Sequence, residues 1–317
     1  MTEPSPTALA QGSFAHPALF YRDQDEYLDG TLPFILDGYA AREPVAVAVP
    51  APRLALLRSA VREAARDAAA RVHWLDMSEA GRNPGRIIPG VLRAFADRHA
   101  AGRVRIIGEP IWPGRSATEY PACVQHEALI NLAFAGRSVT ILCPYDVAGL
   151  GREAVEDART THPVIVDRGG ERASADFAPE RVIEDCNRPL PERPDVEPVP
   201  FDLDTIPLIR ELARRIGGEL GLGERRAGDL ELAVNELAAN SARHGGGTGV
   251  LRVWSENGHV VCEVRDAGRI TDPLVGRIPV GLSTDGGRGV LMVNHLADLV
   301  RLRTGPEGTT VRAYIRI

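Results

Sequence analysis

The 317-residue sequence contains no lysine, so all 37 of its basic residues are arginines. A phosphate-binding P-loop requires a lysine, a eukaryotic-type protein kinase requires one on a strand, and a pyridoxal phosphate enzyme requires one for its Schiff base. The composition therefore excludes these three classes. The net charge of −6, with no basic stripe, also argues against direct binding of nucleic acid.

Long apolar runs and paired cysteines are missing as well. No segment approaches the roughly 18 apolar residues that span a bilayer, and residues 1–13 lack the regions of a signal peptide. We therefore expect a cytoplasmic protein that does not associate with membranes. The four cysteines, Cys123, Cys143, Cys186 and Cys262, show no paired spacing, which indicates reduced thiols rather than a disulfide framework.

The length and the changes in composition predict two domains. Residues 1–13 are polar and read as a disordered tail, and residues 186–200 are rich in proline and read as a stiff linker. Residues 14–185 and 201–317 are the two predicted domains.

In residues 14–185, short apolar runs alternate with helical patterns, which is typical of parallel β-α-β units in a three-layer α/β domain. Strands are predicted at residues 44–49, 72–76, 104–108, 138–143 and 164–166, and helices at residues 25–42, 54–70, 87–99 and 119–134. Pro33 is expected to bend or interrupt the first of these helices.

The segment from Asp229 to Gly246 carries the most informative pattern of the chain. Its residues Leu230, Ala233, Val234 and Leu237 repeat as on one buried face of a helix. The polar residues Glu236, Asn240 and His244 recur every four positions along the edge of that face, where they would line a pocket. Asparagine is a poor residue for mid-helix positions, and such conflicts often mark functional sites. A solvated flank of an amphipathic helix is the alternative.

The remainder of the second domain is predicted to contain helices at residues 205–217 and 289–297. Hairpins are predicted from strands at residues 250–255 and 259–265, turning at Asn257-Gly258, and from strands at residues 299–304 and 309–315. The glycines after His244 end the long helix.

Four motifs in this domain follow one another in the order of a known superfamily. The pattern Glu236, Asn240, His244, Gly245 resembles the N box of the GHKL ATPases, in the form found in anti-sigma-factor serine kinases. Further matches are Asp266-Ala267-Gly268 after a strand, Gly286-Gly287-Arg288-Gly289 before a helix, and Gly308-Thr309-Thr310 in the last strand. The resemblance implies a two-layer α/β sandwich that binds ATP and Mg²⁺.

The resemblance also assigns roles to individual residues. It implies that Asn240 coordinates Mg²⁺, that Glu236 is the general base, and that Asp266 accepts a hydrogen bond from adenine. It implies nucleotide contacts for the remaining motif residues, namely Arg243, His244, Gly268, Gly287, Arg288, Gly289 and Thr309. The sequence departs from the family at Ile270, where a second glycine is common, and this puts catalytic turnover in doubt.

The N-terminal half resembles the MEDS sensory domain, a RecA-like α/β module of prokaryotic regulators. The likeness rests on the segments 16–21 (HPALFY) and 108–116 (GEPIWPGRS), and on the helix with Glu119, His126, Glu127 and Asn131. Residues 50–53 (PAPR) follow the early strand without any phosphate loop. The resemblance therefore implies a sensor of a ligand or state that does not hydrolyse nucleotide.

Two further features of this half have both functional and structural interpretations. Trp112, with Glu109 and Arg115, follows a strand where α/β domains bind ligands, so it either lines a small-ligand pocket or packs over the sheet end. The pair Cys123 and His126, together with Cys143 and His16 elsewhere, supplies metal-ligand types, but this spacing without a second pair is also typical of buried thiols and a capping histidine.

These features predict an anti-sigma-type serine/threonine kinase gated by the sensory domain. Its partners would be a sigma factor and an anti-anti-sigma (antagonist) protein, whose serine it would phosphorylate, and family analogy suggests a homodimer. One alternative is a catalytically weak switch whose interface depends on nucleotide. The other is a sensor histidine kinase, but the proline-rich linker holds the place of the helical hairpin that such enzymes need.

Overall fold

The computed structural model describes residues 14–279 and 287–317. The chain divides into two compact units: the first comprises Met1–Gly81 and Ile87–Ile183, and the second comprises Arg82–Arg86 and Glu184–Ile317. None of the described helices is long and apolar enough to cross a membrane.

A sheet forms the centre of the first unit and has, within the described residues, seven strands in the order β3-β2-β4-β5-β1-β6-β7. Its neighbouring strands are parallel except for the antiparallel pair β6 and β7. The strands are β1 Pro17–Tyr21, β2 Val45–Val49, β3 His73–Asp76, β4 Val104–Gly108, β5 Val139–Asp146, β6 Val164–Asp167 and β7 Gly170–Ala173. Every residue of β2 is buried, as expected for a parallel strand that is covered on both faces.

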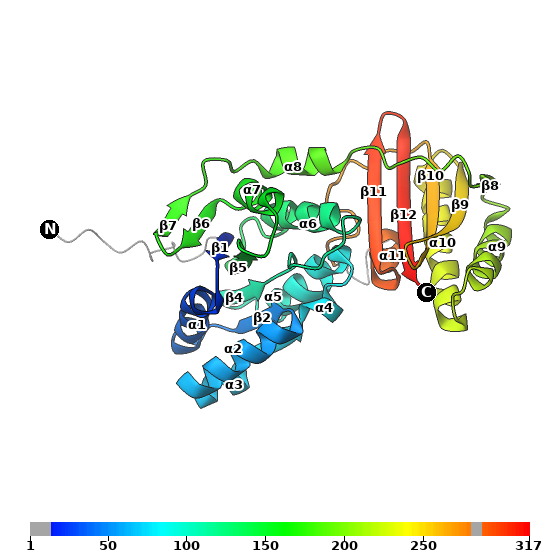
Figure 1. The fold of residues 1–317 in the computed structure, drawn as a ribbon. Coiled ribbons are helices and arrows are strands. Elements are labelled where there is room, and N and C mark those ends of the chain that lie inside the picture. The colour runs from blue at the N-terminus through cyan, green and yellow to red at the C-terminus, as the bar shows by residue number, and fades with distance from the viewer. Residues whose placement is uncertain (1–13, 280–286) are drawn as a thin grey trace. The chain divides into compact units, whose positions relative to one another are not determined.

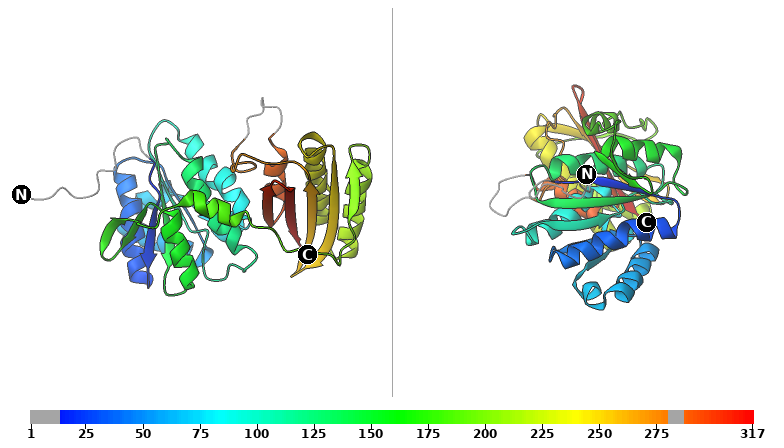
Figure 2. Two further views of the ribbon diagram at one scale, coloured as in Figure 1. Left: turned by 90° about the horizontal axis from the view of Figure 1, so that it is seen from above. Right: turned by 90° about the vertical axis from the view of Figure 1, so that its left-hand side faces the viewer.

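Helices cover both faces of this sheet (Figure 2, right). On one face, Leu19, Val47 and Leu142 form a core with residues of α1, α2 and α3, and α6 packs against α7. The helices are α1 Gln24–Ala40, α2 Ala51–Ala64, α3 Arg66–Arg71, α4 Met77–Ala80, η2 Ile87–Arg93, α5 Ala94–Arg98, α6 Tyr120–Ala133, α7 Arg152–Thr161 and α8 Pro179–Cys186. The predicted three-layer α/β architecture is confirmed.

Three helix predictions differ from the structure in detail. Pro33 lies inside an unbroken α1. The single helix predicted for residues 54–70 is divided into α2 and α3, because Ala65 has an extended backbone with φ −157° and ψ 93°. The segment predicted as a regular helix at residues 87–99 begins as the π-helix η2, which contains Pro89. A proline inside a helix lacks the N–H donor and collides with the preceding turn, and a wider turn relieves that collision.

The second unit contains, in its described part, a five-stranded antiparallel sheet in the order β11-β12-β10-β9-β8. The strands are β8 Val199–Asp202, β9 Thr248–Glu256, β10 His259–Asp266, β11 Leu299–Gly305 and β12 Gly308–Arg316 (Figure 1). The helices are α9 Ile206–Glu219, α10 Glu224–His244 and α11 Gly289–Leu296, and the short η1 Pro84–Arg86 also belongs to this unit.

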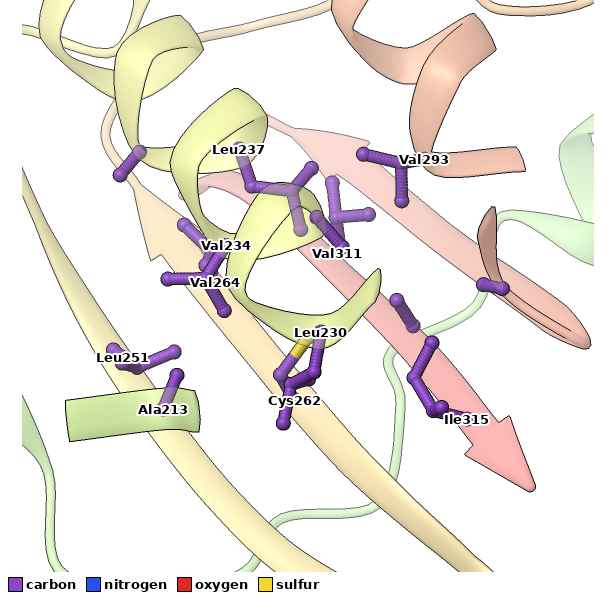
Figure 3. Close-up of a cluster of buried hydrophobic side chains, with 14 of the residues drawn as sticks. Ala213, Leu230, Val234, Leu237, Leu251, Cys262, Val264, Val293, Val311 and Ile315 are labelled. Carbon is purple, nitrogen blue, oxygen red and sulfur yellow. The ribbon is translucent and has the colours of Figure 1, made fainter. Parts of the chain in front are cut away.

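One face of this sheet packs against the helices. Figure 3 shows Leu230, Val234 and Leu237 of α10 pointing toward Val264 of β10 and Val311 of β12. The predicted buried face of the helix is therefore correct, and the two-layer sandwich is confirmed.

The β9–β10 hairpin turns at Asn257 and Gly258, whose φ angles of 48° and 74° match the predicted type I′ turn. The sequence patterns did not predict β8, which pairs with β9 at the edge of the sheet. Its Pro200 cannot donate a ladder hydrogen bond, and an edge strand is where a sheet tolerates that loss.

Candidate functional site

A cavity of about 280 Å³ lies in the second unit, lined by residues of α10, α11, β10 and β12 and of the loop that follows β10. Its lining residues are Leu237, Asn240, Ser241, His244, Gly245, Val264, Asp266, Gly268, Arg269, Ile270, Val275, Gly287, Gly289, Val290, Thr309 and Val311. The cavity combines apolar walls with a few convergent polar groups, which is the usual character of a small-molecule site.

The apolar lining residues belong to several elements. Leu237 of α10 and Val264 of β10 are buried members of the domain core, whereas Ile270 and Val275 come from the loop after β10. A flat, uncharged ring such as a nucleobase can replace water between such walls and gain from the burial of its faces.

Asp266, the last residue of β10, is the carboxylate of the cavity. Its Oδ2 accepts a hydrogen bond of 2.6 Å from the Ser241 hydroxyl, and its Oδ1 accepts one of 2.8 Å from the Gly268 amide. These two bonds fix the orientation of the carboxylate. Each carboxylate oxygen retains a second lone pair, so Asp266 can still accept a hydrogen bond from a ligand.

Glycines allow the backbone to approach closely around this carboxylate. A Cβ atom on Gly268 would lie 2.5 Å from the His244 carbonyl oxygen and 2.8 Å from Gly245 Cα. Gly308 has φ of +109°, and a Cβ there would lie 2.0 Å from the Asp266 carbonyl oxygen. Any side chain at these two positions would push the end of α10 and the start of β12 away from β10.

A chain of hydroxyl groups holds the loop that follows Asp266. Thr309 Oγ1 donates to the Gly268 carbonyl at 2.9 Å, and Thr304 Oγ1 lies 2.9 Å from Thr309 Oγ1. The Ile270 amide in turn donates to Thr304 Oγ1 at 2.9 Å. The main chain of Ile270 is therefore anchored to β11, while its side chain lines the cavity.

Asn240 and Gly289 lie at the edge of the cavity formed by α10 and α11. A Cβ on Gly289 would lie 2.7 Å from Asn240 Nδ2, so glycine keeps the first residue of α11 close to the asparagine amide. The first amides of a helix have no partner within it and attract anions. Gly286, the first glycine of the predicted phosphate loop, lies outside the described residues.

Most of the predicted site residues meet at this cavity. Asn240, His244, Asp266, Gly268, Gly287, Gly289 and Thr309 line it, whereas Glu236, Arg243 and Arg288 are not among its lining residues. Sequence reasoning did not single out Ser241 or Arg269. The signal for Ser241 was weak but present, because it lies four residues after Leu237 and therefore on the same face of α10.

The residues of the cavity fit ATP and Mg²⁺, the ligands that the family resemblance implies. Asp266 offers an oriented acceptor for an exocyclic amine, the glycines leave room for a ligand close to the backbone, and the amide oxygen of Asn240 is a hard ligand of the kind that Mg²⁺ accepts.

In the first unit, polar side chains gather near the carboxyl ends of β1, β4 and β5. The Tyr21 hydroxyl donates to Glu109 Oε1 at 3.3 Å, and the Arg53 guanidinium lies 4.7 Å from the centre of the Tyr27 ring and 3.7 Å from Asp146. Glu109 is 2% exposed. Burial raises its pKa to about 8, against the opposing effect of the nearby Arg53 charge.

The loop residues Trp112 and Arg115 contact each other. The guanidinium carbon of Arg115 lies 3.9 Å from the centre of the Trp112 ring, and its nitrogens donate to the carbonyls of Pro110 and Gly81. The side chain of Arg115 is 3% exposed. These contacts support the interpretation of Trp112 as a packing residue of its loop.

Comparisons with known proteins match each unit to a domain family. The model of the MEthanogen/methylotroph, DcmR Sensory domain (MEDS) matches residues 15–163, and the model of the histidine kinase-like ATPase domain matches residues 199–315. No curated protein matches the chain.

Two solved structures show a weak similarity to the chain. The RsbU and RsbW domains of Rv1364c from Mycobacterium tuberculosis are 22% identical with a TM-score of 0.29, over 38% of this chain and 32% of that one. The ATP synthase subunit NeqB from Nanoarcheaum equitans is 9% identical with a TM-score of 0.35, over 74% of this chain and 64% of that one. Similarities this weak do not indicate a shared activity.

Apart from residues 82–86, the residues matched by the MEDS model lie in the first unit, and those matched by the ATPase-domain model lie in the second. Seven of the predicted site residues line the cavity of the second unit. The chain therefore combines an N-terminal MEDS sensory domain with a C-terminal ATP-binding domain of the histidine-kinase-like (GHKL) type.

Proposed function

We propose that this protein is a serine kinase of the anti-sigma type whose activity is controlled by its sensory domain. The observation that carries the proposal is the convergence of Asn240, Asp266 and Gly289 on one cavity. These residues supply an amide oxygen for a metal ion, a carboxylate for a nucleobase, and a helix start for phosphates.

The individual residues would act as follows. Asp266 accepts a hydrogen bond from the adenine amino group, and Asn240 holds Mg²⁺ through its amide oxygen. The amides of Gly287 and Gly289 bind phosphate oxygens. When bound, Mg-ATP supplies the transferable γ-phosphoryl group, and catalysis consists largely of positioning and charge neutralisation.

Glu236 would be the general base that accepts the proton of the substrate serine hydroxyl. It is half-buried and precedes Asn240 by one helical turn, and it does not line the cavity. Glu236 therefore lies next to the nucleotide site but not in its wall. This position suits a base that contacts the serine hydroxyl of a protein substrate.

A short segment from the N-terminal half of the sequence packs within the ATPase unit, and we take this as support for control by the sensory domain. Residues 82–86 interrupt the first unit in sequence but belong to the second. There, Asn83 Nδ2 donates to the carbonyls of Asn294 and Ala297 at 2.9 and 3.3 Å. Both acceptors lie at the end of α11, whose first residue lines the cavity.

The partners of such a kinase would be a sigma factor and an antagonist protein that carries the phosphorylated serine. A homodimer and a small ligand of the sensory domain belong to the same proposal. The cytoplasmic location expected from the sequence stays a prediction.

The test begins with calorimetric titration of ATP with and without Mg²⁺. We expect Mg²⁺-dependent binding in the wild type, and an affinity at least about tenfold lower, or 1.4 kcal/mol, in Asn240→Ala. Asn235→Ala is the matched control, because Asn235 precedes Asn240 on α10 but does not line the cavity. Absence of ATP binding to the wild type would contradict the proposal.

Ile270 supports a second candidate function, a switch that binds nucleotide without transferring phosphate. Its amide is anchored to Thr304 and its side chain occupies the wall of the cavity, which restrains the loop. Glu236→Gln separates the two functions: a kinase keeps ATP binding but loses phosphate transfer to candidate antagonists, whereas a switch keeps both binding and cellular output.

A further inference from the structure

The first unit contains a buried cluster of four potential metal ligands that the ATPase site does not involve. His16 precedes β1, Glu127 is on α6, Cys143 is on β5, and His162 follows α7. Each of the four residues is at most 1% exposed. One ligand atom from each lies within 4.8 Å of all the others, and no other such group occurs among the described residues.

Four of the distances between these ligand atoms are close to those around a tetrahedral ion. Glu127 Oε2 lies 3.2 Å from the Nε2 atoms of both His16 and His162. Cys143 Sγ lies 3.4 Å from His16 Nε2 and 3.5 Å from Glu127 Oε2. Zinc bonds of about 2.0 to 2.3 Å place the ligands of a tetrahedron about 3.3 to 3.7 Å apart.

The hydrogen-bond network fixes the tautomer of His16. Asn131 Nδ2 donates to the Thr161 carbonyl at 2.9 Å, so Asn131 Oδ1 faces His16 Nδ1, at 3.2 Å. The oxygen can only accept, so Nδ1 carries the proton and the lone pair of Nε2 points into the cluster.

The same argument applies to His162. Its Nδ1 lies 2.9 Å from the Ala158 carbonyl oxygen, which again can only accept, so Nε2 presents its lone pair. A partner on the outer ring nitrogen is what orients a metal-binding histidine. Both rings of the cluster have such a partner.

In this arrangement two imidazole lone pairs, a carboxylate and a sulfur converge, with only the thiol proton between them. Within the described residues, His162 Nε2 and Glu127 Oε1 have no hydrogen-bond partner, although both atoms are buried. Buried polar atoms without a partner destabilise the folded state, and a cation at the centre would remove the repulsion of the lone pairs.

We propose that His16, Glu127, Cys143 and His162 bind one divalent transition-metal ion, preferably Zn²⁺, in a closed four-coordinate site. Nitrogen, sulfur and carboxylate ligands suit zinc, and a closed, buried set of four protein ligands is typical of a structural ion. Binding transfers the Cys143 thiol proton to solvent and ties β1 and β5 to α6 and the end of α7. None of the four residues lines the ATPase cavity.

The test is the metal content of the full chain, measured by mass spectrometry after dialysis in metal-free buffer. We expect about one zinc per chain in the wild type and loss of that zinc in Cys143→Ala. Cys123→Ala is the matched control, because Cys123 is a buried cysteine on α6, one turn from Glu127, and lies outside the cluster. It should keep its zinc.

Replacement of the ion by Co²⁺ in the wild type provides a second measurement if Cys143→Ala does not fold. A tetrahedral thiolate site then gives intense visible bands and a sulfur-to-cobalt charge-transfer band. A wild type that contains no zinc and takes up neither ion would overturn the proposal. So would a cobalt form without the charge-transfer band, or a folded Cys123→Ala that loses its zinc as Cys143→Ala does.

Discussion

The two carboxylates at strand ends, Asp266 and Glu109, show how neighbours decide the chemistry of a residue. Asp266 accepts hydrogen bonds from a hydroxyl and an amide and lines an open cavity. Glu109 is buried beside two tyrosine rings, and burial raises its pKa to about 8. Asp266 keeps lone pairs that can accept a hydrogen bond from a ligand, whereas Glu109 holds a proton at neutral pH.

The pKa of Glu109 predicts a dependence of stability on pH. Because its folded value of about 8 lies above the usual 4.5, the folded state binds more protons than the unfolded state between these values, so this residue's contribution falls as pH rises through that window. Glu109→Gln removes the titration and keeps an acceptor for Tyr21. The wild type therefore loses stability from pH 5 to pH 8, whereas the variant does not. The difference in free energy of unfolding, variant minus wild type, should increase by about 4 kcal/mol over this range and then level off.

Urea unfolding of both proteins across this pH range measures the difference. Glu171→Gln, at an exposed position of β7, is the control and should follow the wild type. A difference between Glu109→Gln and wild type that does not vary with pH would show that Glu109 is ionised in the folded protein throughout.

At the scale of elements, helix α10 carries both the core and the site of the ATPase domain. Its residues Leu230 and Val234 pack on the sheet, and one turn beyond Leu237 the same face delivers Ser241 to Asp266. The position of the cavity therefore depends on how closely the end of α10 approaches the loop after β10. Gly268 sets that approach.

Gly268→Ala tests this dependence. The added methyl group would meet two backbone atoms at 2.5 and 2.8 Å, which cannot move aside as a side chain can. We expect destabilisation by about 1 to 3 kcal/mol and a clear loss of ATP affinity, measured by urea unfolding and calorimetry.

The control is Gly228→Ala, at a position of α10 where a Cβ meets nothing within 4 Å. Alanine is a better helix former by up to about 1 kcal/mol, so this variant should be slightly more stable and bind ATP as the wild type does. Equal ATP affinities in the two variants would mean that the close approach at Gly268 is not needed.

At the scale of the whole molecule, two units with separate cores predict two unfolding transitions. ATP at 100 times its dissociation constant should stabilise only the ATPase unit, by about 2.7 kcal/mol, and so raise one of two calorimetric transitions by several degrees. The other transition should not move. Asp266→Asn should abolish the shift. A single transition that ATP raises as a whole would show that the units unfold together.

Much of the fold was predictable because its signals are local. The apolar repeat of α10, the Asn257-Gly258 turn and the runs such as residues 45–49 each depend on neighbours within a few positions. Strands β1, β7 and β8 were not predicted, and each is only four or five residues long. Strands β1 and β8 also contain a proline, which is uncommon in strands. The π-helix after Arg86 escaped because helical periodicity does not reveal how tightly a turn is wound.

The ATPase cavity was predictable to a similar extent. Its motif residues occur in short segments whose spacing is visible in the chain, and seven of them line the cavity. The order of strands in the sheet, however, decided that Thr309 lies opposite Asp266. It also decided that Thr304 holds the main chain of Ile270.

The sequence by itself determined the fold class and contains the motifs whose residues line the cavity of the second unit, since periodicity and short motifs are properties of consecutive residues. The tertiary structure alone brought together His16, Glu127, Cys143 and His162. These residues come from four elements and have no regular spacing, and the sequence pattern pointed instead to Cys123 and His126 as companions of His16 and Cys143. Only the pairing of β1 with β5 and the packing of the helices place the four ligands within reach of one ion.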